Sequence, residues 1–138
     1  MVDKDVLMEK VGQIQNCLRR IKETTGLKAE SLDDFDCQDV FVLNLQRAIQ
    51  SSIDLASHVI TDEGWGLPSE LRENFVVLEK QGVISPVLSK QLQKMIGFRN
   101  LAVHDYSAID VAILKSILQK NLKDLEDHYT ALLKFLGY

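Results

Sequence analysis

The sequence lacks the features by which several classes of protein are recognised. No run of about 18 apolar residues is present, so no segment predicts a membrane-spanning helix. There is also no glycine-rich phosphate loop, nucleophile elbow, paired metal-ligand motif, internal repeat or low-complexity segment. No stretch alternates apolar and polar residues in the manner of a half-buried strand. We therefore expect no membrane association, no metal, no cofactor and no β-sheet.

Cysteine is scarce, since the chain contains only Cys17 and Cys37. Neither has a second cysteine or a histidine at metal-ligand spacing, which favours half-buried apolar thiols over a zinc site or a disulfide. The acidic residues 1–5 lead directly into an amphipathic pattern. This start predicts no signal peptide and a cytoplasmic location.

The length of 138 residues fits a single domain, residues 1–138, that buries a core without metal or disulfide staples. Apolar residues make up 46% of the chain and charged residues 26%, as in ordinary soluble proteins. A net charge of -4 argues against binding nucleic acid by bulk electrostatics, because phosphate contacts need a cationic surface. Residues 85–106 depart from this balance, with Lys90, Lys94 and Arg99 against Asp105. We expect any anionic partner to bind at this segment.

Apolar residues recur at three- and four-residue steps over most of the chain, which predicts amphipathic helices. A first helix covers residues 3–24 and stops before Gly26, a second runs over residues 36–60, and a short third covers residues 69–81. Ser85 followed by Pro86 is a strong start for a fourth helix, and Asp110 begins the last one. The expected fold is all-α, an antiparallel bundle of four long helices plus one short helix.

The end of the fourth helix gathers a guanidinium, an imidazole and a phenol. Arg99 lies in the middle of an apolar stripe, and a guanidinium is costly to bury unpaired. Its position therefore predicts a carboxylate partner, a subunit interface or an anionic ligand. Arg99 and His104 are five residues apart, so on a straight helix they point about 140° away from each other. They meet only if the helix unwinds near its end or if two copies of the chain face one another.

The second helix carries Arg47, Asp54 and His58 within a narrow arc. Asp54 and His58 are one turn apart and able to bond, and a carboxylate that orients an imidazole is a catalytic arrangement in some enzymes. Such a pair is more often structural, so we expect at most a supporting role for it. Asp54 is also a candidate partner for Arg99 if the second and fourth helices pack together.

The spacing of Arg99, Asn100, His104 and Tyr106 matches the signature R-N-x-x-x-H-x-Y. With residues 44–49, NLQRAI, and residues 53–60, IDLASHVI, the chain resembles the HepT-like proteins of the HEPN superfamily from end to end. The resemblance implies a small helical bundle that forms a homodimer and acts as a metal-independent ribonuclease. It implies the toxin of a toxin–antitoxin pair whose antitoxin is a minimal nucleotidyltransferase (MNT). It also implies that Tyr106 accepts AMP from that antitoxin.

Metal-free RNA cleavage needs a base, an acid and positive charge on the phosphate. An imidazole can transfer protons near neutral pH, and a guanidinium binds phosphate through two nitrogens. We expect Arg99 to hold the phosphate, His104 to transfer a proton and Asn100 to support their geometry. Phenols are poor acids and bases at neutral pH, so cleavage itself gives Tyr106 no role.

Two other interpretations remain open. The chain could be a non-catalytic HEPN module that binds a nucleotide or a partner and cleaves nothing. It could also be a helical dimerisation protein, in which Arg99 forms a buried interface salt bridge and His104 is a satisfied residue at a helix end.

Overall fold

The computed structural model describes residues 3–138 and contains no strand in that range, so the all-helical prediction is confirmed. Met1 and Val2, part of the acidic start, lie outside the described residues. The helices are α1 (Lys4–Thr25), α2 (Phe35–Asp62), α3 (Leu71–Lys80), α4 (Pro86–His104), α5 (Val111–Lys120) and α6 (Leu122–Phe135), with two short 3₁₀ helices, η1 (Ala29–Asp33) and η2 (Tyr106–Ala108).

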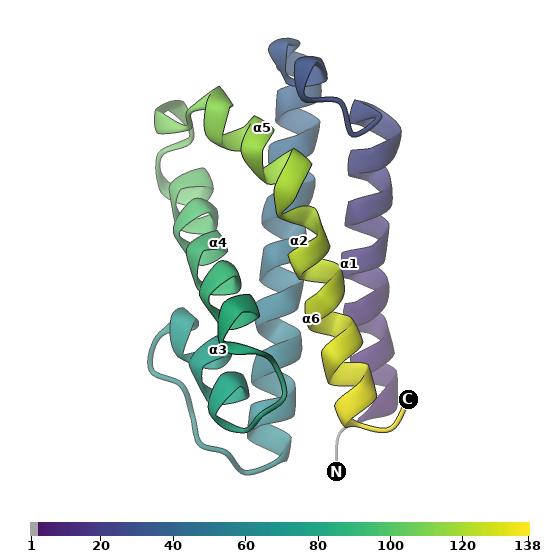
Figure 1. Ribbon diagram of the computed structural model, residues 1–138, viewed down its shortest axis with the longest axis vertical. Coiled ribbons are helices and arrows are strands. Elements are labelled where there is room, and N and C mark those ends of the chain that lie inside the picture. The colour runs from purple at the N-terminus through teal and green to yellow at the C-terminus, as the bar shows by residue number, and fades with distance from the viewer. Residues whose placement is uncertain (1–2) are drawn as a thin grey trace.

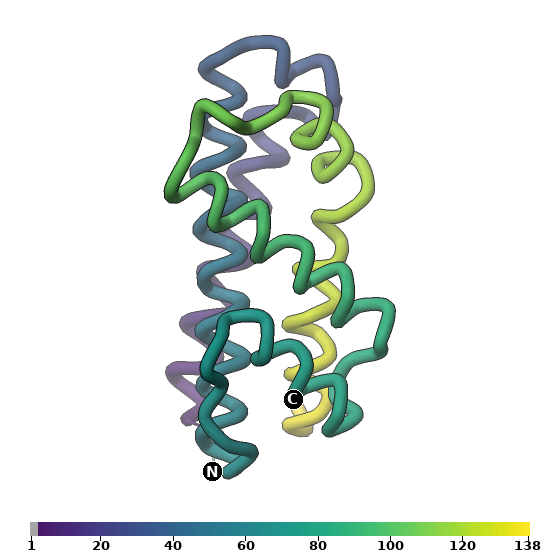
Figure 2. Tube along the Cα trace, turned by 90° about the vertical axis from the view of Figure 1, so that its left-hand side faces the viewer, coloured from purple at the N-terminus to yellow at the C-terminus, as the bar shows by residue number. Residues whose placement is uncertain are grey.

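The long helices α1 and α2 run antiparallel and pack against each other along their lengths (Figure 1). Helix α6 returns beside them, so the C-terminus lies at the same end of the molecule as the start of α1. Figure 2 shows α4 crossing obliquely over α2 and α6, and it contacts both. This crossing carries the C-terminal end of α4 toward the end of the bundle where α2 begins.

Capping residues set several of these boundaries. The Asp3 carboxylate accepts from the backbone N–H of Asp5 at 2.9 Å, and α1 ends at Gly26, whose φ of 61° lies in the left-handed region that glycine favours. Ser85 Oγ accepts from the N–H of Leu88 at 3.1 Å and starts α4 as the sequence predicts. Helix α2 begins at Phe35 because the carboxylate of Asp34 caps it, a little before the start that the sequence predicts.

The start of α3 also differs slightly from its prediction. The apolar spacing predicts a helix over residues 69–81, but the helix begins at Leu71. The backbone N–H and the hydroxyl of Ser69 both donate to Glu73 Oε2, at 2.7 and 3.1 Å. These bonds lower the pKa of Glu73 and connect the α2–α3 segment to the first turn of α3.

The last predicted helix is interrupted at Asn121, so the structure has α5 and α6 in its place. The apolar spacing of Leu118, Leu122 and Leu125 continues across the break, which explains why periodicity did not reveal it. Asn121 Nδ2 donates to Asp124 Oδ2 at 3.0 Å at the junction. The break lets α5 pack on η1 while α6 packs on α1, α2 and α4.

The core includes one fully buried histidine for which the sequence predicted no role. His128 on α6 has no exposed surface, and its Nε2–H donates to the backbone oxygen of Ser52 at 3.0 Å. Its ring stands edge-on to Phe75 with centroids 5.3 Å apart. Burial lowers the pKa of His128 to about 4, against the opposing effect of the bond to Ser52, so the imidazole is neutral at pH 7. The residue thereby joins α6 to α2 and α3.

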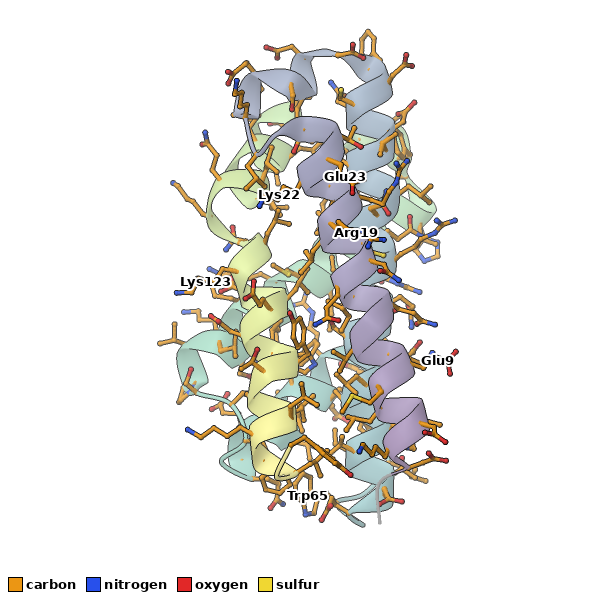
Figure 3. The ribbon with its side chains drawn as sticks, turned by 90° about the vertical axis from the view of Figure 1, so that its right-hand side faces the viewer. Glu9, Arg19, Lys22, Glu23, Trp65 and Lys123 are labelled. Atoms are coloured by element: carbon orange, nitrogen blue, oxygen red, sulfur yellow. The ribbon has the colours of Figure 1, made fainter. Side chains whose placement is uncertain are left out.

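The surface of α1 is polar where it faces away from the core. Glu9, Arg19, Lys22 and Glu23 project outward in Figure 3, and all four are exposed. At the lower end of the same view, Trp65 packs against Phe135 of α6 with ring centroids 5.5 Å apart. Within residues 3–138, no helix is both long enough and apolar enough to cross a bilayer.

Candidate functional site

Arg99, Asn100 and His104 all lie in the last turns of α4, which stays helical through His104. The N–H of Asp105 donates to the carbonyl of Leu101 at 2.8 Å, which closes the final turn. The helix therefore does not unwind between Arg99 and His104, and the two side chains point about 140° apart. A single chain does not bring them together.

Arg99 is partly buried beside the core residues Met95, Ile96 and Ala102 of the same helix. Its Nη1 donates to Asn100 Oδ1 at 2.9 Å, and no ion pair involves Arg99 within residues 3–138. An arginine on an apolar stripe has three explanations: a carboxylate partner, a subunit interface or an anionic ligand. The described residues provide no carboxylate partner for Arg99, which excludes the first of them. A subunit interface and an anionic ligand remain.

The two pairings suggested for Asp54 are wrong. Its carboxylate accepts from Gln50 Nε2 at 2.9 Å and lies 3.6 Å from Lys10 Nζ of α1, so it is engaged with neither Arg99 nor His58. His58 Nε2 is buried and has no hydrogen-bond partner among the described residues. The amide of Gln50 and the ammonium of Lys10 bind the Asp54 carboxylate, so Asp54 does not orient the imidazole of His58.

A cavity of about 570 Å³ lies between α2, α4, the start of α3 and the segment that leads into α3. Asn100 lines it, together with Asp54, Arg72 and other residues of these elements, whereas Arg99, His104 and Tyr106 do not. The motif therefore borders this cavity through its asparagine alone. The exposed side chain of His104 lies on the open surface at the end of α4.

Arg72 is a cation near the motif that no sequence pattern singled out. A Cβ atom placed on Gly97 would lie 3.3 Å from Arg72 Nη2, so the guanidinium of Arg72 lies against α4 one turn before Asn100. Glycine inside a helix costs about 1 kcal/mol relative to alanine, and Gly97 was the available signal that another group approaches there. The structure thus places a second guanidinium against α4, close to the motif residues.

Tyr106 begins η2 directly after α4, and 47% of its surface is exposed. Its hydroxyl donates a hydrogen bond to Asp39 Oδ1, on the second turn of α2. Partial burial, the bond to Asp39 and the negative charge of Asp39 together raise the pKa of Tyr106 to about 12. No sequence pattern indicated this pair, because its members are 67 residues apart.

Comparison with known proteins agrees with this fold and motif. The sequence model of a family described as "Ribonuclease HepT-like" matches residues 14–132. An mRNA nuclease HepT from Shewanella oneidensis is 36% identical over 122 residues, which are 88% of this chain and 92% of that protein. A tRNA nuclease HepT from Aphanizomenon flos-aquae is 30% identical over 107 residues, which are 75% of this chain and 69% of that protein.

A solved structure gives the same result at the level of the fold. The tri-AMPylated Shewanella oneidensis HEPN toxin in complex with MNT antitoxin superposes with a TM-score of 0.89 and 33% sequence identity, covering 96% of this chain and 99% of that one. The family match spans most of the chain, and the likeness to HepT extends over nearly its whole length. The chain therefore belongs to the HepT-like ribonuclease family and has the HEPN fold.

Proposed function

We propose that this protein is a metal-independent RNA endonuclease, the toxin of a toxin–antitoxin pair, and that an MNT-type nucleotidyltransferase silences it by transferring AMP to Tyr106. The observation that carries the proposal is the intact set of Arg99, Asn100 and His104 on the last turns of α4, with Tyr106 exposed directly beside it. Relatives named as mRNA and tRNA nucleases support cleavage of RNA. We further propose that the protein acts in the cytoplasm.

In the proposed reaction the ribose 2′-hydroxyl attacks the neighbouring phosphorus and the 5′-oxygen leaves. A base takes the 2′-hydroxyl proton and an acid supplies a proton to the 5′-oxygen, which gives a 2′,3′-cyclic phosphate and a 5′-hydroxyl. His104 performs one of these transfers, because imidazole can accept or donate a proton near neutral pH. Arg99 stabilises the charge that grows on the phosphate oxygens, and Asn100 holds the guanidinium of Arg99 through the 2.9 Å bond.

The cleavage site requires two copies of the chain. Arg99 and His104 diverge on a continuous helix, and Arg99 has no carboxylate partner within its own described chain. A two-fold axis beside the end of α4 would set Arg99 of one copy against His104 of the other. It would also cover the partly buried stripe on which Arg99 lies. We therefore propose a homodimer with the RNA phosphate bound between its copies.

Arg72 adds a cation on the RNA path. Its guanidinium lies against α4 at Gly97 and lines the cavity that Asn100 borders. An exposed guanidinium that contacts α4 one turn before Asn100 suits a phosphate neighbouring the one that is cleaved. We assign it to RNA binding and not to the cleavage step.

AMP on Tyr106 would silence the nuclease by charge and by bulk. Each adenylate adds a negatively charged phosphodiester and a purine ring two residues from His104. It would compete with the RNA phosphate for Arg99 and block access to the end of α4. The likeness to a structure of an AMPylated toxin bound to its MNT antitoxin supports this mode of silencing.

The test is cleavage of total RNA, tRNA and mRNA by the purified protein in excess EDTA. Wild type should cut at least one of these, whereas Arg99→Ala should slow cleavage roughly 10²–10³-fold and His104→Ala roughly 10²–10⁴-fold. Arg19→Ala is the matched control, because it removes an exposed arginine from the outer face of α1. Circular dichroism should show the same helicity in all four proteins. Wild type that binds nucleotide but cuts none of the three RNAs would contradict the proposal.

A further inference from the structure

The hydrogen bond from Tyr106 to Asp39 joins two elements that the sequence keeps far apart. Asp39 lies on the second turn of α2 and Tyr106 on η2, and both side chains are exposed enough for a partner protein to reach them. The other two tyrosines have different surroundings. Tyr138 packs its ring under Lys4 Nζ, 5.3 Å from the ring centroid, and Tyr129 is a half-buried residue packed on the core. Only Tyr106 has a carboxylate at its hydroxyl among the bonds of residues 3–138.

AMP transfer to a phenol requires that the phenol lose its proton. The pKa of Tyr106 is raised to about 12, chiefly by partial burial and further by Asp39, so its hydroxyl carries a proton at neutral pH. A neutral phenol is a weak nucleophile, and enzymes activate such groups with an adjacent base. The base must lie within hydrogen-bonding distance of the proton that it removes. Asp39 satisfies this condition before any partner binds.

We propose that Asp39 is a catalytic residue of the AMP transfer that silences this protein, and that its carboxylate takes the proton of Tyr106. The inference rests on the proposed function of Tyr106 as the AMP acceptor. The nucleotidyltransferase supplies ATP and places its α-phosphorus in line with Tyr106 Oη. The Oη–P bond forms, the bond between the α-phosphorus and the bridging oxygen breaks, and pyrophosphate leaves with that electron pair. The phenolic proton moves to Asp39 Oδ1 and then to water.

The neighbouring carboxylates have other partners. Asp33 Oδ1 lies 2.7 Å from Lys115 Nζ, and Asp34 caps α2 by accepting from the N–H of Asp36 at 2.8 Å. Asp105 accepts from Ser107 Oγ at 3.0 Å. Asp39 is therefore the carboxylate that the fold turns toward the acceptor hydroxyl. The toxin would thus contribute a group to the chemistry of its own silencing.

The experiment measures AMP transfer in single turnovers, with the full-length protein, Mg²⁺, ATP and a saturating amount of its cognate MNT-type nucleotidyltransferase. Intact mass gives the fraction of chains that carry adenylate at each time. Asp39→Asn is the decisive variant, since its amide oxygen can still accept the bond from Tyr106 but cannot take the proton. Asp36→Asn is the matched control, because it removes the same charge one turn earlier on α2. Each variant is also assayed for RNA cleavage without the transferase.

Wild type and Asp36→Asn should gain adenylate at the same rate, and Asp39→Asn should be slower by a factor of about 10² or more. Asp39→Asn should cleave RNA as wild type does, because Asp39 has no part in that reaction. Equal transfer rates for Asp39→Asn and wild type would overturn the inference and leave the AMP transfer itself intact. Loss of RNA cleavage together with AMP transfer would also overturn it, since Asp39 would then act by shaping the end of α4. No mass gain on wild type would instead remove Tyr106 as the acceptor, and this inference with it.

Discussion

Arg99 Nη1 donates a hydrogen bond to Asn100 Oδ1 at 2.9 Å, so the two adjacent residues hold each other at the surface of α4. Asn100→Ala should leave the arginine in place but free to move. Cleavage should fall roughly tenfold, as expected for the loss of one hydrogen bond to a charged group, and less than in Arg99→Ala. Single-turnover cleavage rates of the two variants make the comparison. An Asn100→Ala rate as low as that of Arg99→Ala would mean that Asn100 contacts the RNA directly.

Tyr106→Phe removes the proposed AMP acceptor and keeps the ring. Because the side chain is nearly half exposed and its hydroxyl bonds to Asp39 and to no other residue in the range 3–138, the substitution should leave RNA cleavage unchanged. Co-expression with the cognate nucleotidyltransferase should add adenylate to wild type and none to the variant, which should stay toxic. The prediction fails if wild type is neutralised without any gain in mass, since stoichiometric binding would then account for the silencing.

The buried imidazole of His128 makes stability depend on pH. Its pKa is lowered from 6.5 to about 4 in the folded chain, so below pH 6.5 the unfolded chain takes up a proton that the folded chain excludes. Stability should therefore fall as the pH drops from 6.5 toward 4, by at most about 3 kcal/mol at 1.36 kcal/mol per pKa unit. Urea unfolding between pH 7 and pH 4 measures this loss.

His128→Gln is the control for that measurement. A glutamine amide can donate to the carbonyl of Ser52 as Nε2 does, but it does not titrate. The difference in unfolding free energy between wild type and the variant should narrow or reverse from pH 7 to pH 4. Only wild type loses stability through the protonation of His128 in its unfolded state. A constant difference across this range would show that His128 does not control the acid sensitivity.

The sequence predicted most helix boundaries because local chemistry determines them. Asp3, Gly26 and the Ser85-Pro86 pair act within one turn of their own positions, and each marks a boundary that the structure contains. The break at Asn121 escaped prediction because the leucines on both sides keep the same helical spacing. After the break α5 packs on η1, a tertiary contact that the local spacing of leucines does not reveal.

The candidate site likewise contains residues that the sequence could predict and partners that it could not. Arg99, Asn100, His104 and Tyr106 share one short segment, so their spacing alone placed them at one helix end. Their partners come from distant parts of the chain. Asp39 reaches Tyr106 across 67 residues, and Arg72 reaches α4 from the start of α3. Asp54 was a plausible partner for Arg99 by residue type, but its carboxylate bonds Gln50 one turn earlier on the same helix and lies near Lys10 of α1. The position of Lys10 depends on the packing of α1 against α2, which periodicity does not describe.

The central claim is that Arg99 and His104 of two different copies form one RNA-cleaving site. The most direct test is to purify a mixed dimer in which one copy carries Arg99→Ala and the other His104→Ala, and to measure RNA cleavage in EDTA. Each variant alone should cleave RNA roughly 10²-fold or more slowly than wild type, whereas the mixed dimer retains one intact Arg99 and one intact His104 on opposite copies. The mixed dimer should regain a substantial part of wild-type cleavage. A mixed dimer as inactive as its parents, beside an active wild type, would contradict a site shared between copies.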